Sequence, residues 1–294
     1  MSYLNHYSYT IEKFEPEMVT YIKGTSAASQ LISECMLYSL TAGGKRIRPM
    51  LLLEFCHAYG GGFKESIPFA VAIEMIHTYS LIHDDLPCMD DDDLRRGMPT
   101  SHIKYGEDMA VLAGDGLLNT AFEVMTEAAL DSHDNRALKA MQTIAKAAGT
   151  QGMILGQVAD IKYQSREMSL ESLDYINCHK TGKLLMASMY AGAVLGGANE
   201  MELSHVETIG YKVGLLFQIV DDVLDVVGDE QKLGKKTKGD AKNEKTTYPA
   251  LLGLEETKTR IKLLEAEILN LAKALSIDTT FLEETVKFLS CREY

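Results

Sequence analysis

Apolar residues recur along most of the chain with the spacing of α-helices, and strand-like alternation between turn signals is hard to find. Glycine runs such as Gly43-Gly44, Gly60-Gly61-Gly62 and Gly196-Gly197 separate the periodic segments, and only 6 prolines interrupt the 294 residues. The pattern therefore predicts an all-α protein. Helices are expected near residues 3–22, 27–40, 47–58, 65–86, 107–130, 135–149, 169–196, 201–227, 255–273 and 278–289.

Two of these segments, 65–86 and 201–227, are apolar on nearly every side, which is typical of central helices in a large bundle. No stretch rich in Pro, Gly or Ser divides the chain. We therefore expect residues 1–294 to form a single domain, a bundle of about ten or more helices.

Composition narrows the classes of function. The 29 basic and 42 acidic residues give a net charge of −13, which argues against nucleic acid or an anionic membrane as the main partner. The five cysteines are odd in number and never form a C-x-x-C pair, so neither a disulfide framework nor a zinc site is indicated. The first residues do not resemble a signal peptide, and no apolar run is long enough to span a bilayer. We expect a soluble, unprocessed, cytoplasmic protein without membrane insertion.

The first apolar segment ends in an acidic motif. Six aspartates fall within the ten residues from Asp84 to Asp93, and Arg95-Arg96 follow directly. Two carboxylates about 4 Å apart repel by roughly 4 kcal/mol at an effective dielectric of about 20, so the motif requires a bound multivalent cation or exposure to water. Pro87 makes continued regular helix unfavourable, and the resulting loop is expected to return Asp90 to the side of Asp84.

The second apolar segment ends in a second acidic motif. Asp221 and Asp225 are four residues apart and Gln218 precedes Asp221 by three, so all three project from one stripe of a helix. Carboxylates suit Mg²⁺, which usually completes its octahedron with substrate phosphate. A solvated surface would explain one such motif. Two motifs at the negative ends of apolar helices favour a bound metal.

Basic residues supply the other half of a phosphate site. Lys45, Arg46 and Arg48 stand at an expected helix start, where they can bind a diphosphate without metal. His77 lies two turns before Asp84 and can add a donor, although a histidine in an apolar helix is more often a core residue. The dipeptide His83-Asp84 also occurs in metal phosphohydrolases, but no partner His/Asp set accompanies it here.

Further cations are scattered through the later chain, and each alone is more often a surface lysine. They are Lys180 and Lys183 around Thr181-Gly182, and Lys235 and Lys245. The last two lie in the polar stretch 228–247, which is rich in Gly, Lys and Asp and is expected to form a mobile lid over the second acidic motif.

Taken in order, these motifs resemble the short-chain trans-polyprenyl diphosphate synthases, most of all their bacterial farnesyl diphosphate synthases. The resemblance rests on five blocks, namely Gly43-Gly44-Lys45-Arg46-x-Arg48-Pro49, Asp84-Asp85-x4-Asp90 with Arg95-Arg96-Gly97, Lys180-Thr181-Gly182, Phe217-Gln218-x2-Asp221-Asp222-x2-Asp225 and Lys245-Thr246-Thr247-Tyr248-Pro249. The resemblance covers nearly the whole chain, and the five blocks occur in the family's order.

The resemblance implies an isoprenoid synthase fold, in which helices surround a deep central cavity and two Asp-rich motifs face each other across its mouth. It implies three Mg²⁺ ions, with Mn²⁺ as a possible substitute, on Asp84, Asp85, Asp90, Asp221, Asp222 and Asp225. By the same resemblance the allylic diphosphate lies on Arg95, Lys180, Lys235 and Lys245, and isopentenyl diphosphate on Lys45, Arg48, His77 and Arg96. Lys180, Thr181 and Gln218 are expected to line the allylic cation, and with Asp84 and Asp221 they form the catalytic set.

The implied reaction condenses dimethylallyl or geranyl diphosphate with isopentenyl diphosphate and releases diphosphate. Tyr79, five residues before Asp84, resembles the bulky residue that closes the family's product pocket at C15, and Ser80 follows it. Farnesyl diphosphate is therefore the expected product, and a homodimer the expected assembly. Three alternatives remain open from the residues: a C20 geranylgeranyl diphosphate synthase, a terpene cyclase with a different second motif, and an acidic divalent-cation-binding protein.

Overall fold

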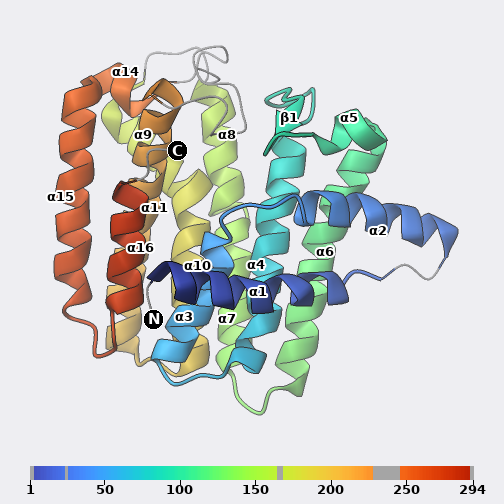
Figure 1. Cartoon of the computed structure of the whole chain (residues 1–294), viewed down its shortest axis with the longest axis horizontal. Helices are drawn as coiled ribbons and strands as arrows, with labels where there is room; N and C mark the ends of the chain where they lie inside the picture. Colours follow the sequence, from blue (N-terminus) through green and yellow to red (C-terminus); the bar gives the residue numbers. More distant parts are fainter. Residues whose placement is uncertain (1–2, 24–25, 164–167, 228–245, 292–294) are drawn as a thin grey trace.

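The computed structural model describes residues 3–23, 26–163, 168–227 and 246–291, which are helical apart from one short hairpin and the connecting turns (Figure 1). The elements in chain order are α1 (Tyr3–Thr20), α2 (Ala27–Leu40), α3 (Ile47–Ala58), α4 (Phe63–Asp84), β1 (Leu94–Arg95), β2 (Met98–Pro99), α5 (Ser101–Tyr105), α6 (Glu107–Asp131), α7 (Arg136–Ala148), α8 (Met153–Tyr163), α9 (Leu170–Asn177), η1 (Cys178–Gly182), α10 (Lys183–Gly196), α11 (Glu200–Val227), α14 (Tyr248–Leu252), α15 (Leu254–Ala272) and α16 (Thr280–Ser290).

The predicted all-α class is confirmed, and the helix bounds agree closely with the apolar pattern. The segments 27–40 and 47–58 coincide with α2 and α3, and most others begin and end within two residues of the observed helices. The segment 169–196 is an exception, because the π-helical turn η1 divides it into α9 and α10. The pattern also missed the hairpin, the five-residue helices α5 and α14, and α8, whose exposed side carries the apolar residues Ile154, Val158 and Ile161.

The long helices pack as neighbours around α4, α10 and α11. Helix α4 packs against α6 and α3, α10 against α3, α7 and α11, and α11 against α15 (Figure 1). Helices α1 and α2 lie across the long helices rather than along them (Figure 1). The two apolar segments predicted to be central are therefore α4 and α11, each of which has neighbours on several sides.

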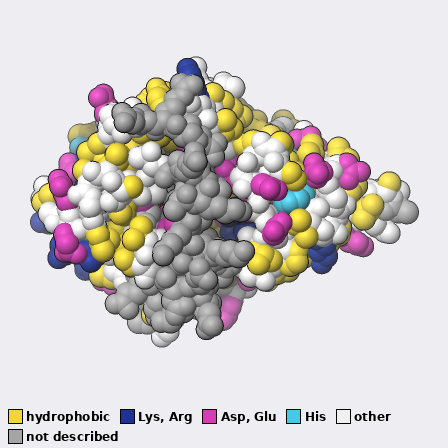
Figure 2. Space-filling view, turned by 90° about the horizontal axis from the view of Figure 1, so that it is seen from above, with side chains coloured by type: hydrophobic (Ala, Val, Ile, Leu, Met, Phe, Trp, Pro, Cys, Tyr) yellow, Lys and Arg dark blue, Asp and Glu magenta, His cyan; other side chains and the backbone are white. Residues whose placement is uncertain are grey.

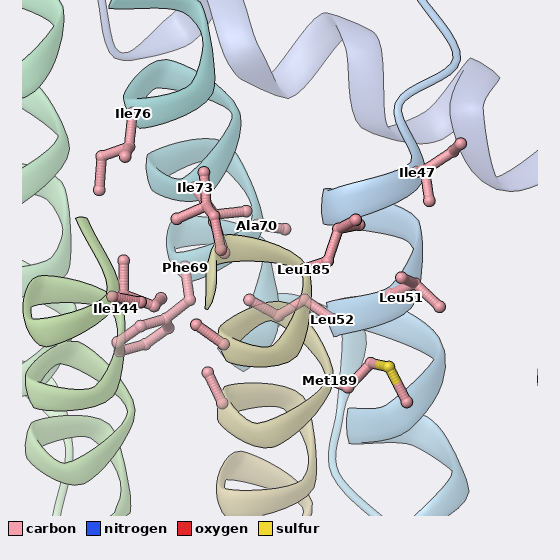
Figure 3. Close-up of a cluster of buried hydrophobic side chains, with 14 of the residues drawn as sticks. Ile47, Leu51, Leu52, Phe69, Ala70, Ile73, Ile76, Ile144, Leu185 and Met189 are labelled. Carbon is pink, nitrogen blue, oxygen red and sulfur yellow. The ribbon is translucent and has the colours of Figure 1, made fainter. Parts of the chain in front are cut away.

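The core lies where α3, α4, α7 and α10 meet. Leu52 of α3 points toward Phe69 and Ile73 of α4, and Leu185 of α10 lies between α10 and α3 (Figure 3). One cluster of buried apolar side chains extends from Phe14 to Leu289, so helices from both ends of the described chain contribute to the same core. This packing fixes α4 against its neighbours along its full length.

Helices α4 and α11 end at the same end of the bundle, close to β1 and α14 (Figure 1). The acidic motifs follow or complete these helices, so the fold brings both to one face. Viewed from above, acidic side chains gather on the side of β1 and α5 (Figure 2). In the part of the chain that the structure describes, no helix is long and apolar enough to cross a membrane.

Candidate active site

A cavity of about 280 Å³ lies between the start of α3, the middle of α4, the β1–β2 turn and the end of α11. Its lining contains all four residues expected to hold isopentenyl diphosphate, and two of the aspartates of the second acidic motif. The lining residues are Gly44, Lys45, Arg46, Ile47, Arg48, Glu74, His77, Arg96, Phe217, Asp221, Leu224 and Asp225. The fold thus brings the basic block and the second acidic motif to one cavity.

The basic side chains at the cavity suit an anionic ligand. The Nε of Arg48 is buried and makes no hydrogen bond within the described residues. Burial lowers the pKa of Arg48 to about 10, and Arg96 adds to the lowering, while Glu74 and Asp221 oppose it. Burial also lowers the pKa of His77 well below its usual value, and Arg48, Arg96, Arg95 and Arg46 lower it further. His77 is therefore neutral near pH 7, and the positive charge comes from the arginines and Lys45.

The turns around the cavity depend on glycine. Gly43 and Gly44 have φ values of 85° and 120°, which favour residues without a Cβ. A Cβ at Gly44 would lie 2.6 Å from the guanidinium carbon of Arg96. Arg96 itself has a left-handed backbone, and its Nη1 donates to the carbonyl of Gly43. The basic block and Arg96 are therefore locked together, although they are far apart in the sequence.

The first acidic motif folds back as predicted. Helix α4 ends at Asp84, Pro87 lies in the following turn, and the Asp90 amide donates to the Asp84 carbonyl at 2.9 Å. The Asp84 carboxylate accepts from the Gln157 amide, and its Oδ2 lies 3.6 Å from Nζ of Lys180. Asp84 therefore faces α8 and the π-helical turn.

The Asp85 side chain points toward Arg95 and not toward α8 as Asp84 does. It is buried, and both of its oxygens accept from Nε of Arg95, at 2.8 and 2.9 Å. Burial alone would lower the pKa of Arg95, but the hydrogen bond and the charge of Asp85 outweigh it, so the pKa is raised. The structure therefore pairs one residue assigned to the metal with one assigned to the allylic diphosphate.

Lys180 and Thr181 lie on η1, between α8 and α11. Nζ of Lys180 donates to Asp160 of α8 at 2.7 Å. Burial would lower the pKa of Lys180, but Asp84 and Asp160 raise it above the usual value, so the lysine carries its charge. The hydroxyl of Thr181 donates to Oε1 of Gln218 at 3.0 Å, which joins two of the residues expected to line the allylic cation.

Asp222 occupies a different environment on α11 from Asp221 and Asp225. Asp222 is buried and accepts from the Gln218 amide at 2.9 Å and from the backbone N–H of Tyr248 at 3.0 Å, so it anchors the chain before α14. Asp221 and Asp225 line the cavity. Oδ1 of Asp225 is buried and has no hydrogen-bond partner within the described ranges.

These donors fit a hard divalent cation. The buried, unpaired oxygen of Asp225 is costly without a counter-charge, and carboxylates at the ends of two helices are the ligands that Mg²⁺ prefers. Among the described side chains, however, no three His, Cys, Asp or Glu lie close enough to hold a metal alone. The protein therefore provides part of a coordination shell, which substrate oxygens would complete.

Tyr79 and Ser80 lie one turn before the acidic motif. Tyr79 is buried, and its ring meets the ring of His83 edge-on at 5.7 Å. His83 lies 3.1 Å from the Val111 carbonyl, so this side of α4 faces α6. The hydroxyl of Ser80 donates to the His77 carbonyl.

Sequence reasoning missed three charged or polar residues at the site: Glu74 at the cavity, and Gln157 and Asp160 on α8. Gln157 and Asp160, three residues apart after Gly156, were a usable signal, as was Glu74 in the middle of the apolar segment 65–86. Lys235, Lys245 and the expected lid up to residue 245 lie outside the described residues.

Comparison with known proteins gives concordant matches. A family model described as polyprenyl synthetase matches residues 29–278. Farnesyl diphosphate synthase of Bacillus subtilis (strain 168) is 46% identical over 264 residues, which cover 90% of this chain and 89% of the relative. Chloroplastic geranylgeranyl pyrophosphate synthase of Capsicum annuum is 52% identical over 229 residues, 78% of this chain and 62% of the relative. A crystal structure of geranyltransferase from Helicobacter pylori, complexed with magnesium and isoprenyl diphosphate, matches with a TM-score of 0.87 at 36% identity, covering 98% of this chain and 96% of that one.

Proposed function

The chain belongs to the polyprenyl synthetase family, and we propose that the two halves of the site described above divide its reaction between two diphosphates. The enzyme is a short-chain prenyltransferase that joins an allylic diphosphate to isopentenyl diphosphate. The observation that carries the division is the cavity that holds Lys45, Arg48, His77 and Arg96 together, separate from the Asp84–Lys180 contact.

Isopentenyl diphosphate occupies the cavity in this proposal. Its diphosphate binds the arginines and Lys45, and its double bond points toward Phe217 and the end of α11. The allylic diphosphate binds beside Asp84, with Lys180 as a donor and Arg95, Lys235 and Lys245 as further ligands. We propose that Thr181 and Gln218, which are hydrogen-bonded to each other across η1 and α11, line the space between the two diphosphates.

Bond breaking comes first in the proposed mechanism. The allylic C–O bond breaks, its electron pair leaves with the diphosphate, and Lys180 stabilises the negative charge that develops there. The oxygens of Thr181 and Gln218 stabilise the allylic cation, which the double bond of isopentenyl diphosphate attacks. The released diphosphate takes the proton that the new cation loses, so no protein nucleophile or general base is required.

The reaction depends on Mg²⁺, as is general for this family. When bound, the metal would offset charge on the departing diphosphate. We propose that three ions bind, that Asp84, Asp90, Asp221 and Asp225 are the carboxylates nearest to them, and that Mn²⁺ is a substitute. Asp85 and Asp222 also belong to the proposed metal-side set. Each already accepts hydrogen bonds within the protein, so we propose that they act by positioning the neighbouring residues.

The main product is farnesyl diphosphate. The bacterial relative named for this product aligns over nearly the whole chain, whereas the plant relative named for the C20 product aligns over a smaller share. We propose that Tyr79 closes the product pocket at C15. Its bulk is buried on the turn before Asp84, and the smaller Ser80 is tied to the backbone.

We expect wild-type protein, given dimethylallyl diphosphate, excess isopentenyl diphosphate and Mg²⁺, to yield mainly C15 product, and Tyr79→Ala to shift the main product to C20 or longer. Removing the ring opens space beyond the C15 position. Radiolabelled products are hydrolysed and sized by chromatography. Ser80→Ala is the control and should keep the C15 product. A wild-type product of C20, or an unchanged length in Tyr79→Ala, would contradict the pocket assignment.

We propose that the enzyme acts in the cytoplasm on small-molecule substrates, as a homodimer. The five cysteines are all unpaired, which is consistent with a reducing compartment. Val111 and Leu112 of α6 are exposed, and Ile154, Val158 and Ile161 form an exposed apolar stripe on α8. Exposed apolar side chains of this kind favour contact with a partner copy over contact with water.

A charge among the exposed apolar residues of α6 should break the dimer. We expect Leu112→Asp to convert a dimeric wild type into monomers in size-exclusion chromatography with light scattering, because an aspartate would be buried at the interface. Leu263 is exposed on α15, so Leu263→Asp is the control and should stay dimeric. A monomeric wild type, or a dimeric Leu112→Asp, would refute this arrangement.

A further inference from the structure

Arg46 and Glu74 form an ion pair inside the bundle, at the edge of the cavity. Nη1 of Arg46 donates to Oε1 of Glu74 at 2.7 Å, and the two side chains are 1% and 2% exposed. Nη2 of Arg46 donates to the Leu40 carbonyl at 2.8 Å, and Nε donates to Glu15 at 3.3 Å. The guanidinium is therefore held by residues of α1, α2 and α4 together.

The backbone of Arg46 explains why this hold matters. Its φ of 47° and ψ of 33° are left-handed, a conformation that is unfavourable for a residue with a Cβ and persists only where the surroundings enforce it. Arg46 is also the residue just before α3. Its side-chain bonds therefore fix the turn that places Lys45 before it and Arg48 after it, both of which line the cavity.

Glu74 also acts on the charge of the cavity. It lies one helical turn before His77 on α4, and both line the cavity. Burial lowers the pKa of Arg48 and of Arg96, and in both cases Glu74 is the foremost neighbour that opposes the lowering. Glu74 therefore offsets part of the positive charge of these arginines, while its carboxylate oxygen Oε1 accepts a hydrogen bond from Arg46.

We propose that Glu74, acting through Arg46, is a positioning residue for the isopentenyl diphosphate subsite, because it fixes the turn that presents Lys45 and Arg48 to the diphosphate. The inference rests on the proposed function, since it takes isopentenyl diphosphate as the occupant of the cavity. A buried ion pair usually stabilises a fold no better than a well-packed apolar pair of similar volume. We therefore explain the Arg46–Glu74 pair by its orienting effect on the turn that carries Lys45 and Arg48.

The test uses Glu74→Gln, which keeps the shape and one oxygen acceptor but removes the charge. We expect the KM for isopentenyl diphosphate to rise about tenfold, which corresponds to about 1.4 kcal/mol, and the KM for geranyl diphosphate to stay within about twofold. The Kd of isopentenyl diphosphate, measured by calorimetry in the presence of EDTA, should rise by the same factor. This binding readout does not depend on catalysis.

Two further variants separate positioning from stability. The double variant Arg46→Met/Glu74→Leu replaces the pair by apolar groups, so its Tm should return close to that of the wild type while the KM for isopentenyl diphosphate stays raised. Glu202→Gln is the matched control. Glu202 is buried, accepts from Tyr59 and Ser276, and does not line the cavity, so its loss should lower the Tm and leave both KM values unchanged.

Three results would overturn the positioning role: a Glu74→Gln variant with a lower Tm but an unchanged Kd, an equal rise in both KM values, or a double variant with the wild-type KM for isopentenyl diphosphate. Failure of the proposed function looks different. In that case wild-type protein itself forms no prenyl product and binds no isopentenyl diphosphate. An active wild type with an unresponsive Glu74→Gln would refute only the positioning role.

Discussion

Asp84→Asn should reduce kcat/KM by a factor of about a thousand or more, which corresponds to a loss of about 4 kcal/mol of transition-state stabilisation. Asp84 ends α4, accepts from Gln157 and lies 3.6 Å from the Lys180 ammonium. An asparagine preserves the size and the bond to Gln157 but removes the charge. A metal-bound diphosphate would then lose one of its carboxylate anchors, while the fold stays intact.

Asp92→Asn is the matched control for this variant. Asp92 belongs to the same motif, but its side chain is 48% exposed and lies 3.7 Å from Arg95 rather than at Lys180. We expect its kcat/KM to stay within about threefold of the wild type. A loss in Asp92→Asn comparable to that in Asp84→Asn would mean that the loop presents a different aspartate to the metal.

Calorimetry on the same two variants distinguishes the enzyme from an acidic cation-binding protein. Mg²⁺ should bind wild-type protein more tightly when geranyl diphosphate is present, because the described carboxylates form no complete shell by themselves. Asp84→Asn should weaken this coupling and Asp92→Asn should keep it. An equal Mg²⁺ affinity with and without geranyl diphosphate would favour the cation-binding alternative.

The helix bounds were predictable because their signals are local. An apolar period and a glycine stop lie within a few residues of each end, as at α10, where Gly197 has a φ of 96° and follows the last helical residue. The acidic and basic motifs were predictable for the same reason. Their spacing along one helix decides which side chains share a face.

Pairings between distant segments carried no such signal. Asp85 and Asp84 are equivalent in the sequence, and only the β1–β2 hairpin returns Arg95 to Asp85 and so separates their roles. Arg46 and Glu74 meet because α3 packs against α4. The π-helical turn was likewise missed, since residues 169–196 have a helical pattern throughout. The turn depends on α8 and α11, which close on it from both sides.

Gly156→Ala should disturb this turn and should be among the most damaging single-methyl additions to the protein. A Cβ at Gly156 would lie 2.5 Å from Cα of Lys180, and this neighbour is backbone, so it cannot rotate away. Overpacking at a rigid contact typically costs about 1–3 kcal/mol, and here the group displaced carries Lys180 and Thr181. We therefore expect the free energy of unfolding to fall by about 3 kcal/mol, and kcat to fall by about a hundredfold or more.

The opposite side of the turn is packed equally closely against α11, because a Cβ at Gly214 of α11 would clash with Cα of Gly182. The turn thus has no room to retreat from α8, which is why the expected effect is large. Gly116→Ala is the control. It adds a methyl group inside α6, where the nearest neighbour is the flexible Met36 side chain at 3.0 Å.

Alanine is the better helix former by about 1 kcal/mol, so Gly116→Ala should be neutral or stabilising and fully active. Urea unfolding and steady-state kinetics on both variants provide the comparison. If Gly156→Ala keeps wild-type kcat, the position of Lys180 and Thr181 does not depend on close packing against α8. If it loses stability but retains kcat at low temperature, α8 supports the fold without setting the geometry of the catalytic turn.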